Sequence, residues 1–134
     1  MKIKTTKREL STTRNVLDNE RAATKAWLIA LGVPAEVAAN HDFSQRLEVK
    51  TCAAGTLVKS TYFYNCFACA VQTTGKRSFI QDGKVIADVE NNYHRGYSTF
   101  GHGKMDTKDG EDGWLRDEGM RDFDRVAHKI LRGE

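Results

Sequence analysis

The sequence predicts an α+β domain, in which a small antiparallel sheet of three or four strands packs with an N-terminal helical pair and a C-terminal amphipathic helix. Two observations predict this class. Apolar residues recur at helical spacing near both ends of the chain, and the middle is rich in β-branched and aromatic residues. The length of 134 residues suits one domain and is too short for two of ordinary size. We expect a basic, partly flexible N-terminal arm over 1–12, a single domain over 13–134, and helices that cover one face of the sheet.

Three segments are expected to be helices, and the first and last have apolar residues at helical spacing. The first runs from Thr13 to Leu31 and ends before Gly32 and Pro34, which stop helices. A short second helix follows over 34–40, with proline at its first position, where the missing N–H costs nothing. The last helix lies within 114–131 and could begin as late as Met120, because the glycine before it weakens the first turn.

Strand patterns fill the middle of the chain. Residues 46–52 alternate polar and apolar side chains, as a half-buried strand does. The stretch 56–73 is too long for one ordinary strand, which indicates a bend near Asn65 or two paired segments. Residues 78–80 and 84–89 flank an Asp-Gly pair, the best short hairpin signal in the sequence.

A single apolar core is expected, because two periodic helices flank the strand-rich middle. Its expected members are Val16, Trp27, Leu31, Val58, Ile86, Phe123, Ile130 and Leu131.

Positive charge is concentrated in the first half of the chain. The net charge is +3 overall, made of +6 over residues 1–77 (12 Lys and Arg against 6 Asp and Glu) and −3 over 78–134 (9 against 12). A basic arm can neutralise phosphates, so a nucleic-acid-binding protein is one alternative function. The residues that would do so are Lys2, Lys4, Lys7, Arg8 and Arg14.

Cys66 and Cys69 have the spacing of half a zinc site, and His94 and His102 could complete it. The cysteines lie among strand-forming residues, however, and side chains three apart on a strand point to opposite faces. We therefore expect free thiols, Cys52 included, with no metal and no cofactor. The acidic residues within 106–112 fit no register of a calcium-binding loop.

The segment 91–112 has no periodicity, and we expect a long glycine- and aromatic-rich loop. Aromatic, basic and titratable side chains alternate there with glycines, a composition typical of interaction sites. The expected partner-binding residues are Tyr93, His94, Arg95, Tyr97, Phe100, His102 and Lys104.

The function that these patterns favour is a small, cytoplasmic, non-enzymatic binding protein of an accessory, inhibitor or regulatory type, such as phage and mobile elements encode. Its partner would be another protein rather than nucleic acid, bound through the 93–104 loop. No membrane contact is expected, because the longest uncharged run, Ala26 to Ala35, is too short to span a bilayer. A second alternative is a hydrolase-like enzyme centred on His94 and His102, although no nucleophile-elbow motif is present.

Overall fold

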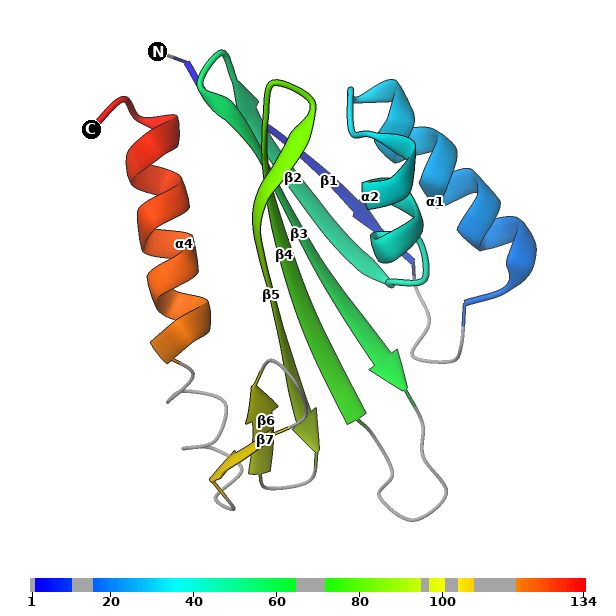
Figure 1. Cartoon of the computed structure of the whole chain (residues 1–134). Helices are drawn as coiled ribbons and strands as arrows, with labels where there is room; N and C mark the ends of the chain where they lie inside the picture. The colour runs from blue at the N-terminus through cyan, green and yellow to red at the C-terminus, as the bar shows by residue number, and fades with distance from the viewer. Residues whose placement is uncertain (1, 11–15, 65–71, 95–96, 101–103, 108–117) are drawn as a thin grey trace.

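The structure of the chain is a computed structural model, and it describes residues 2–10, 16–64, 72–94, 97–100, 104–107 and 118–134. Its strands form one antiparallel sheet in sequential order, from β1 at one edge to β7 at the other (Figure 1). The elements, in chain order, are β1 (Lys4–Glu9), α1 (Asp18–Ala30), α2 (Ala35–His41), β2 (Arg46–Cys52), β3 (Gly55–Tyr64), β4 (Gln72–Gln81), β5 (Lys84–His94), β6 (Tyr97–Phe100), β7 (Lys104–Thr107) and α4 (Glu118–Leu131).

The α+β class is confirmed, whereas the expected number of strands is wrong. Strands β1 to β5 have at least six residues each, and β6 and β7 extend the sheet with four residues each. Three strands lie where the sequence predicted other structures. Residues Lys4–Glu9 form the edge strand β1 instead of a flexible arm, and 97–100 and 104–107 are strands within the segment expected to be a loop.

Both differences have a physical reason. Strand β1 pairs with β2 along its whole length, and Ile3 just before it packs into an apolar cluster, so tertiary contacts order the basic segment. In the second segment, β6 pairs with the far end of β5 and β7 pairs with β6. Glycines between these short strands remove the regular alternation by which a sequence indicates a strand.

The central hairpins follow the sequence closely. Strand β2 occupies the predicted range, and the stretch 56–73 contributes to two paired strands, β3 and β4. The β4–β5 turn has positive φ at Asp82 (52°) and Gly83 (74°), the geometry for which an Asp-Gly pair is favoured in tight hairpins.

The sheet is covered on both faces, so the expectation of helices on one face is wrong. Helices α1 and α2 pack on one face, and α4 packs on the other, to the left of the sheet in Figure 1. Neighbouring strand residues divide between the two faces because side chains alternate: Leu57 and Phe79 face α4, whereas Val58 and Ile80 face α1 and α2.

Two apolar clusters therefore replace the single predicted core. The first contains Leu28, Val33, Val37, Ala38, Leu47, Val49, Val58 and Ile80, and the second contains Leu57, Phe79, Ala127 and Leu131. Trp27 and Leu31 pack against the first, Phe123 and Ile130 against the second, and Val16 is half-buried. Ile86 was predicted to be buried but is 51% exposed. A bulge in β5 opposite Phe79 and Ile80 leaves Ile86 with no residue opposite it in the β4–β5 register.

Helix α1 begins later than the apolar pattern indicated. Helix α1 starts at Asp18, where the Glu20 carboxylate accepts a hydrogen bond from the Leu17 N–H at 2.9 Å. Pro34 immediately precedes α2. None of the helices in the described part of the chain is long and apolar enough to cross a membrane.

Candidate functional site

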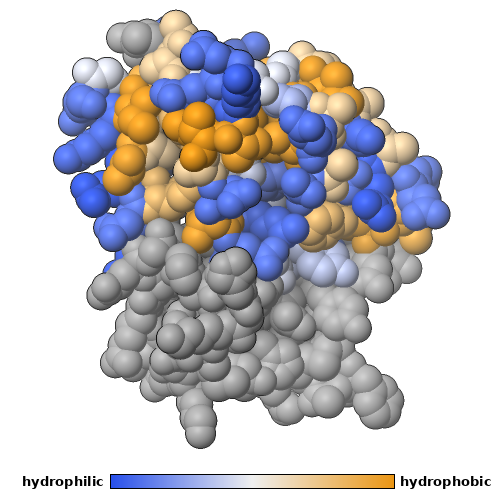
Figure 2. Space-filling model, viewed as in Figure 1, coloured by the Kyte–Doolittle hydropathy of each residue, from blue (hydrophilic) through white to orange (hydrophobic). Residues whose placement is uncertain are grey.

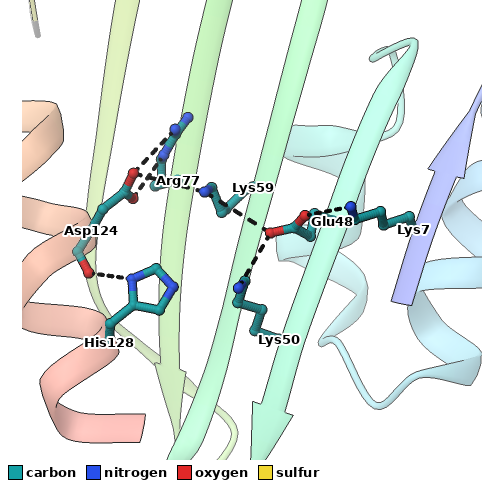
Figure 3. Close-up of polar contacts among 7 residues, drawn as sticks. All are labelled: Lys7, Glu48, Lys50, Lys59, Arg77, Asp124 and His128. Carbon is teal, nitrogen blue, oxygen red and sulfur yellow. Dashed lines mark hydrogen bonds and ion pairs between the residues drawn. The ribbon is translucent and has the colours of Figure 1, made fainter. Parts of the chain in front are cut away.

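Charged side chains lie directly opposite one another across four strands on the α4 face of the sheet. Lys7 of β1 pairs in register with Glu48 of β2, Glu48 with Lys59 of β3, and Lys59 with Arg77 of β4. Asp124 of α4 continues the line beyond Arg77 (Figure 3). We call these five residues the charged row. It joins the last helix to the edge strand β1.

The strongest contact of the charged row is between β4 and α4. Arg77 donates from Nε to Asp124 Oδ1 at 2.9 Å and from a terminal nitrogen to Oδ2 at 3.3 Å, a two-point pairing. The Arg77 side chain is only 15% exposed, which favours such a pair over one in open solvent. Lys59 Nζ lies 3.8 Å from Asp124 Oδ2 and 4.0 Å from Glu48 Oε1, so it connects the two carboxylates.

Glu48 is shared by three ammonium groups. Its oxygens lie 3.6 Å from Lys7 Nζ and 3.8 Å from Lys50 Nζ, in addition to the Lys59 contact. The charged row together with Lys50 holds four cations and two carboxylates. Two positive charges therefore have no carboxylate of their own within this group (Figure 3).

An open pocket of about 290 Å³ adjoins the charged row. Its lining residues are Lys7, Glu9, Arg46, Leu47, Glu48, Lys59, Thr61 and Arg77. Glu9 and Arg46 pair across β1 and β2 at 3.5 Å, so the pocket wall also has four cations and two carboxylates. A concave surface of this charge attracts an anionic group.

His128 contacts the backbone at the α4 end of the charged row. Its Nδ1–H donates to the backbone oxygen of Asp124 at 2.6 Å, since a carbonyl oxygen can only accept (Figure 3). This bond lies within α4, one turn along the helix.

A second polar group, centred on His41, lies on the opposite face beneath α2. His41 Nδ1 is 2.6 Å from Ser60 Oγ and Nε2 is 2.8 Å from Ser78 Oγ. Burial lowers the pKa of His41 to about 4, and the positive charge of Lys76 adds to this effect. The imidazole is therefore neutral at pH 7. Although serine and histidine can act as nucleophile and base, His41 is 1% exposed and offers no access to a substrate.

Other polar and charged side chains surround His41. Asp42 pairs with Arg21 of α1 at 3.1 Å, and Lys76 Nζ lies 4.5 Å from the centre of the Phe43 ring. Ser44 Oγ, in contrast, is buried and has no hydrogen-bond partner among the residues that the structure describes. This group connects helix to sheet, which is a structural role.

The structure brings the backbones of most predicted partner-binding residues together. Tyr93 and His94 are on β5, Tyr97 and Phe100 on β6, and Lys104 on β7. In the ladder, Tyr93 lies opposite Ser98, His94 opposite Tyr97, and Phe100 opposite Lys104. Arg95 and His102 lie outside the described residues, so the geometry of the alternative His94 and His102 site is untested.

The basic N-terminal residues do not share one surface. Lys7 belongs to the charged row, whereas Arg8 turns to the other face and donates from Nε to Thr24 Oγ1 of α1 at 3.0 Å. Lys4 is on β1 and Lys2 precedes it, and Arg14 is outside the described residues. Strand formation thus divides the residues that the nucleic-acid alternative placed on a single arm.

The predicted thiols are described only in part. Cys52 is a free, half-buried thiol that donates to the Leu131 backbone oxygen at 3.3 Å. Cys66 and Cys69 lie outside the described residues. Within the described ranges, no three His, Cys, Asp or Glu side chains are grouped so that they could hold a metal ion.

Sequence reasoning missed the charged row. The alternation in β2 showed that Glu48 and Lys50 share its polar face, but only the register reveals which residues lie beside them. Exposed apolar side chains were missed as well. They gather over α4 and the adjoining strands between hydrophilic residues (Figure 2), and include Val85, Ile86 and Val126.

Comparison with known proteins returns no relative: no family model, curated protein or solved structure matches this chain.

Proposed function

We propose that the protein is a small, non-enzymatic binding protein of an accessory, inhibitor or regulatory type, and that its macromolecular partner presents an anionic surface. The observation that carries the proposal is the excess of positive charge on the α4 face. The charged row and Lys50 together hold four cations and two carboxylates beside an open pocket. An anionic group there would supply the missing counter-charges and speed encounter with the partner.

A protein partner fits this surface better than nucleic acid does. Glu9 and Glu48 also line the pocket, and their charges would repel a continuous phosphate backbone. Separate acidic side chains on a protein can avoid these two carboxylates while reaching the cations. Lys7 and Arg8 lie on opposite faces of β1, so the basic N-terminal residues do not form one surface for a nucleic acid, which also favours a protein partner.

The β5–β6–β7 ladder is the second contact region of the proposal. It gathers a segment rich in tyrosine, histidine and basic residues, and among these types tyrosine and arginine often dominate interface energies. We expect Tyr93→Ala, Arg95→Ala or Tyr97→Ala to weaken partner binding while the melting temperature barely changes. A clear loss of melting temperature in all three variants would mean instead that the segment serves stability.

The charge argument can be tested with a fluorescein-labelled oligoglutamate and a labelled DNA duplex of equal charge, using fluorescence anisotropy at low salt. We expect the double variant Lys7→Gln/Lys50→Gln to bind the peptide about tenfold more weakly than the unmodified protein. The matched control Lys84→Gln/Lys129→Gln removes the same charge outside the charged row and should bind normally. Equal weakening in both double variants would contradict a specific site. Tighter binding to the duplex than to the peptide would favour the nucleic-acid alternative.

A further inference from the structure

Strand β1 is one end of the sheet order, and it pairs only with β2 among the described strands. The direction of its backbone groups follows from one hydrogen bond. The Leu10 N–H donates to the Gln45 oxygen at 2.8 Å, at the position that continues the β1–β2 register. Alternate residues of an antiparallel strand direct both their N–H and their C=O to the same neighbour.

This alternation assigns the backbone groups of β1 to two sides. Those of Lys4, Thr6 and Arg8 are directed at β2, as is Leu10. The backbone groups of Thr5, Lys7 and Glu9 are therefore directed away from the sheet. Three N–H donors and three C=O acceptors form a row along the outer edge, which is the arrangement that accepts an additional strand.

The edge is accessible. Thr5, Lys7 and Glu9 are all exposed, and the side chains of Lys7 and Glu9 are each 70% exposed. These three side chains lie on the α4 face, as the contact between Lys7 and Glu48 shows. A strand added at this edge would continue the sheet beside the charged row.

We propose that an extended, acidic segment of the protein partner adds to β1 as a further strand of the sheet. The proposal rests on the proposed function and specifies the kind of partner. Residues of the added strand that hydrogen-bond to Thr5, Lys7 and Glu9 have side chains on the same face as these residues. Acidic side chains opposite Thr5 and Lys7 would lie beside the Lys7 ammonium and near the pocket, where cations outnumber carboxylates, whereas the position opposite Glu9 suits an uncharged residue.

Charge complementarity favours this occupant over a second copy of the chain. In a two-fold pairing of β1 with itself, only the outward-facing residues can exchange hydrogen bonds, which limits the possible registers. Two registers share the greatest overlap: one sets Lys4 opposite Arg8 of the copy, and the other sets Lys7 opposite its own copy. Like charges directly opposite each other destabilise a strand pair.

The protein side of the test uses a substitution that removes one outward donor and leaves the β1–β2 ladder intact. Thr5→Pro removes an N–H that is directed away from β2, and proline is tolerated on edge strands in this orientation. Thr5→Val is the matched control, because it changes the same side chain and keeps the N–H. Circular dichroism and a melting curve verify that both variants are folded.

The probe is a fluorescein-labelled peptide of alternating valine and glutamate, about eight residues long, which is a common strand length. A matched peptide with N-methylated glutamates has the same charge but lacks the donors that face β1. We expect Thr5→Pro to bind the unmethylated peptide at least about tenfold more weakly than Thr5→Val does. The unmodified protein should bind the methylated peptide more weakly than the unmethylated one by a similar factor. Hydrogen exchange of the Thr5, Lys7 and Glu9 amides should slow when the unmethylated peptide is added, whereas Thr6 and Arg8 are already protected.

Three results would overturn strand addition. If Thr5→Pro and Thr5→Val bind the peptide equally and amide exchange is unchanged, strand addition is rejected. In that case the proposed function still stands if Lys7→Gln/Lys50→Gln weakens binding. Absence of binding by the unmethylated peptide, under conditions in which oligoglutamate binds, would also reject it. A dimer in light scattering that Thr5→Pro separates would assign the edge to a second copy.

Discussion

On the α1–α2 face of the sheet, His41 lies between Ser60 and Ser78 and is 1% exposed, whereas on the α4 face Lys7 of the charged row has a side chain that is 70% exposed. Both groups are polar and both join neighbouring elements. The buried one is neutral and hydrogen-bonded, whereas the charged one runs from the exposed Lys7 to the sheltered Arg77–Asp124 pair and has more cations than carboxylates. Polar groups withdrawn from water must be paired to be tolerated, so the His41 group should serve stability. Exposed ion pairs contribute little to stability, so the Lys7 end of the charged row, which the proposed partner would contact, should contribute little.

The largest expected effect is loss of the buried imidazole. His41→Ala removes a side chain that fills space beneath α2 and leaves the hydroxyls of Ser60 and Ser78 without their partner. We expect the free energy of unfolding to fall by about 3 kcal/mol, from the cavity and the unpaired groups together. Urea denaturation followed by circular dichroism measures it. His128→Ala, on the α4 face, serves as the comparison and should cost less than about 1 kcal/mol.

Lowering the pH should also reduce stability through His41. Because the folded pKa of His41, about 4, lies below its usual value of 6.5, the unfolded chain takes up this proton first, and stability falls as the pH decreases from 6.5 towards 4. Between pH 7 and pH 5 the expected loss is about 2 kcal/mol. His41→Gln should lack this part of the pH dependence, so the difference between the two unfolding curves isolates it. Parallel curves would show that His41 does not titrate in this way.

Two buried serines provide a sharper comparison within one face. Ser60→Ala removes the partner of His41 Nδ1 and should cost about 1 to 2 kcal/mol. Ser44→Ala removes a buried hydroxyl that has no partner within the described part of the chain, so it should leave stability unchanged or raise it by up to about 1 kcal/mol. Thermal melts of the two variants side by side test this. An equal loss in both would mean that the Ser44 hydroxyl is paired in solution.

The smallest effects belong to the charged row. Lys7→Gln should change the free energy of unfolding by less than about 0.5 kcal/mol, because the ion pair with Glu48 is exposed and screened by salt. Arg77→Gln should cost more, about 1 kcal/mol, since its two-point pairing with Asp124 is mostly sheltered from solvent. Measuring the free energy of unfolding of both variants at low and high salt distinguishes the exposed ion pair of Lys7 from the sheltered pair of Arg77. If Lys7→Gln were the more costly change, the charged row would serve stability rather than binding.

Local patterns in the sequence were sufficient for several elements. Strand β2 and the Asp82–Gly83 turn could be predicted because alternation and turn chemistry depend only on neighbouring residues. The apolar faces of α1 and α4 are likewise visible as helical spacing. The charge of the first half of the chain was also visible, but its distribution between the two sides of β1 was not.

Only the tertiary structure decided which residues meet. Lys7, Glu48, Lys59 and Arg77 are far apart in the sequence, and the register of three strand pairs brings them into one row. Register depends on long-range pairing, because a shift of one residue would move every side chain to the opposite face. The same dependence explains His41: no local signal marks a histidine at the end of a short helix as buried, and its low pKa arises from burial against the sheet and from the positive charge of Lys76. Composition and spacing therefore determined the class of fold and the helical faces, whereas the contacts between distant strands determined the sites.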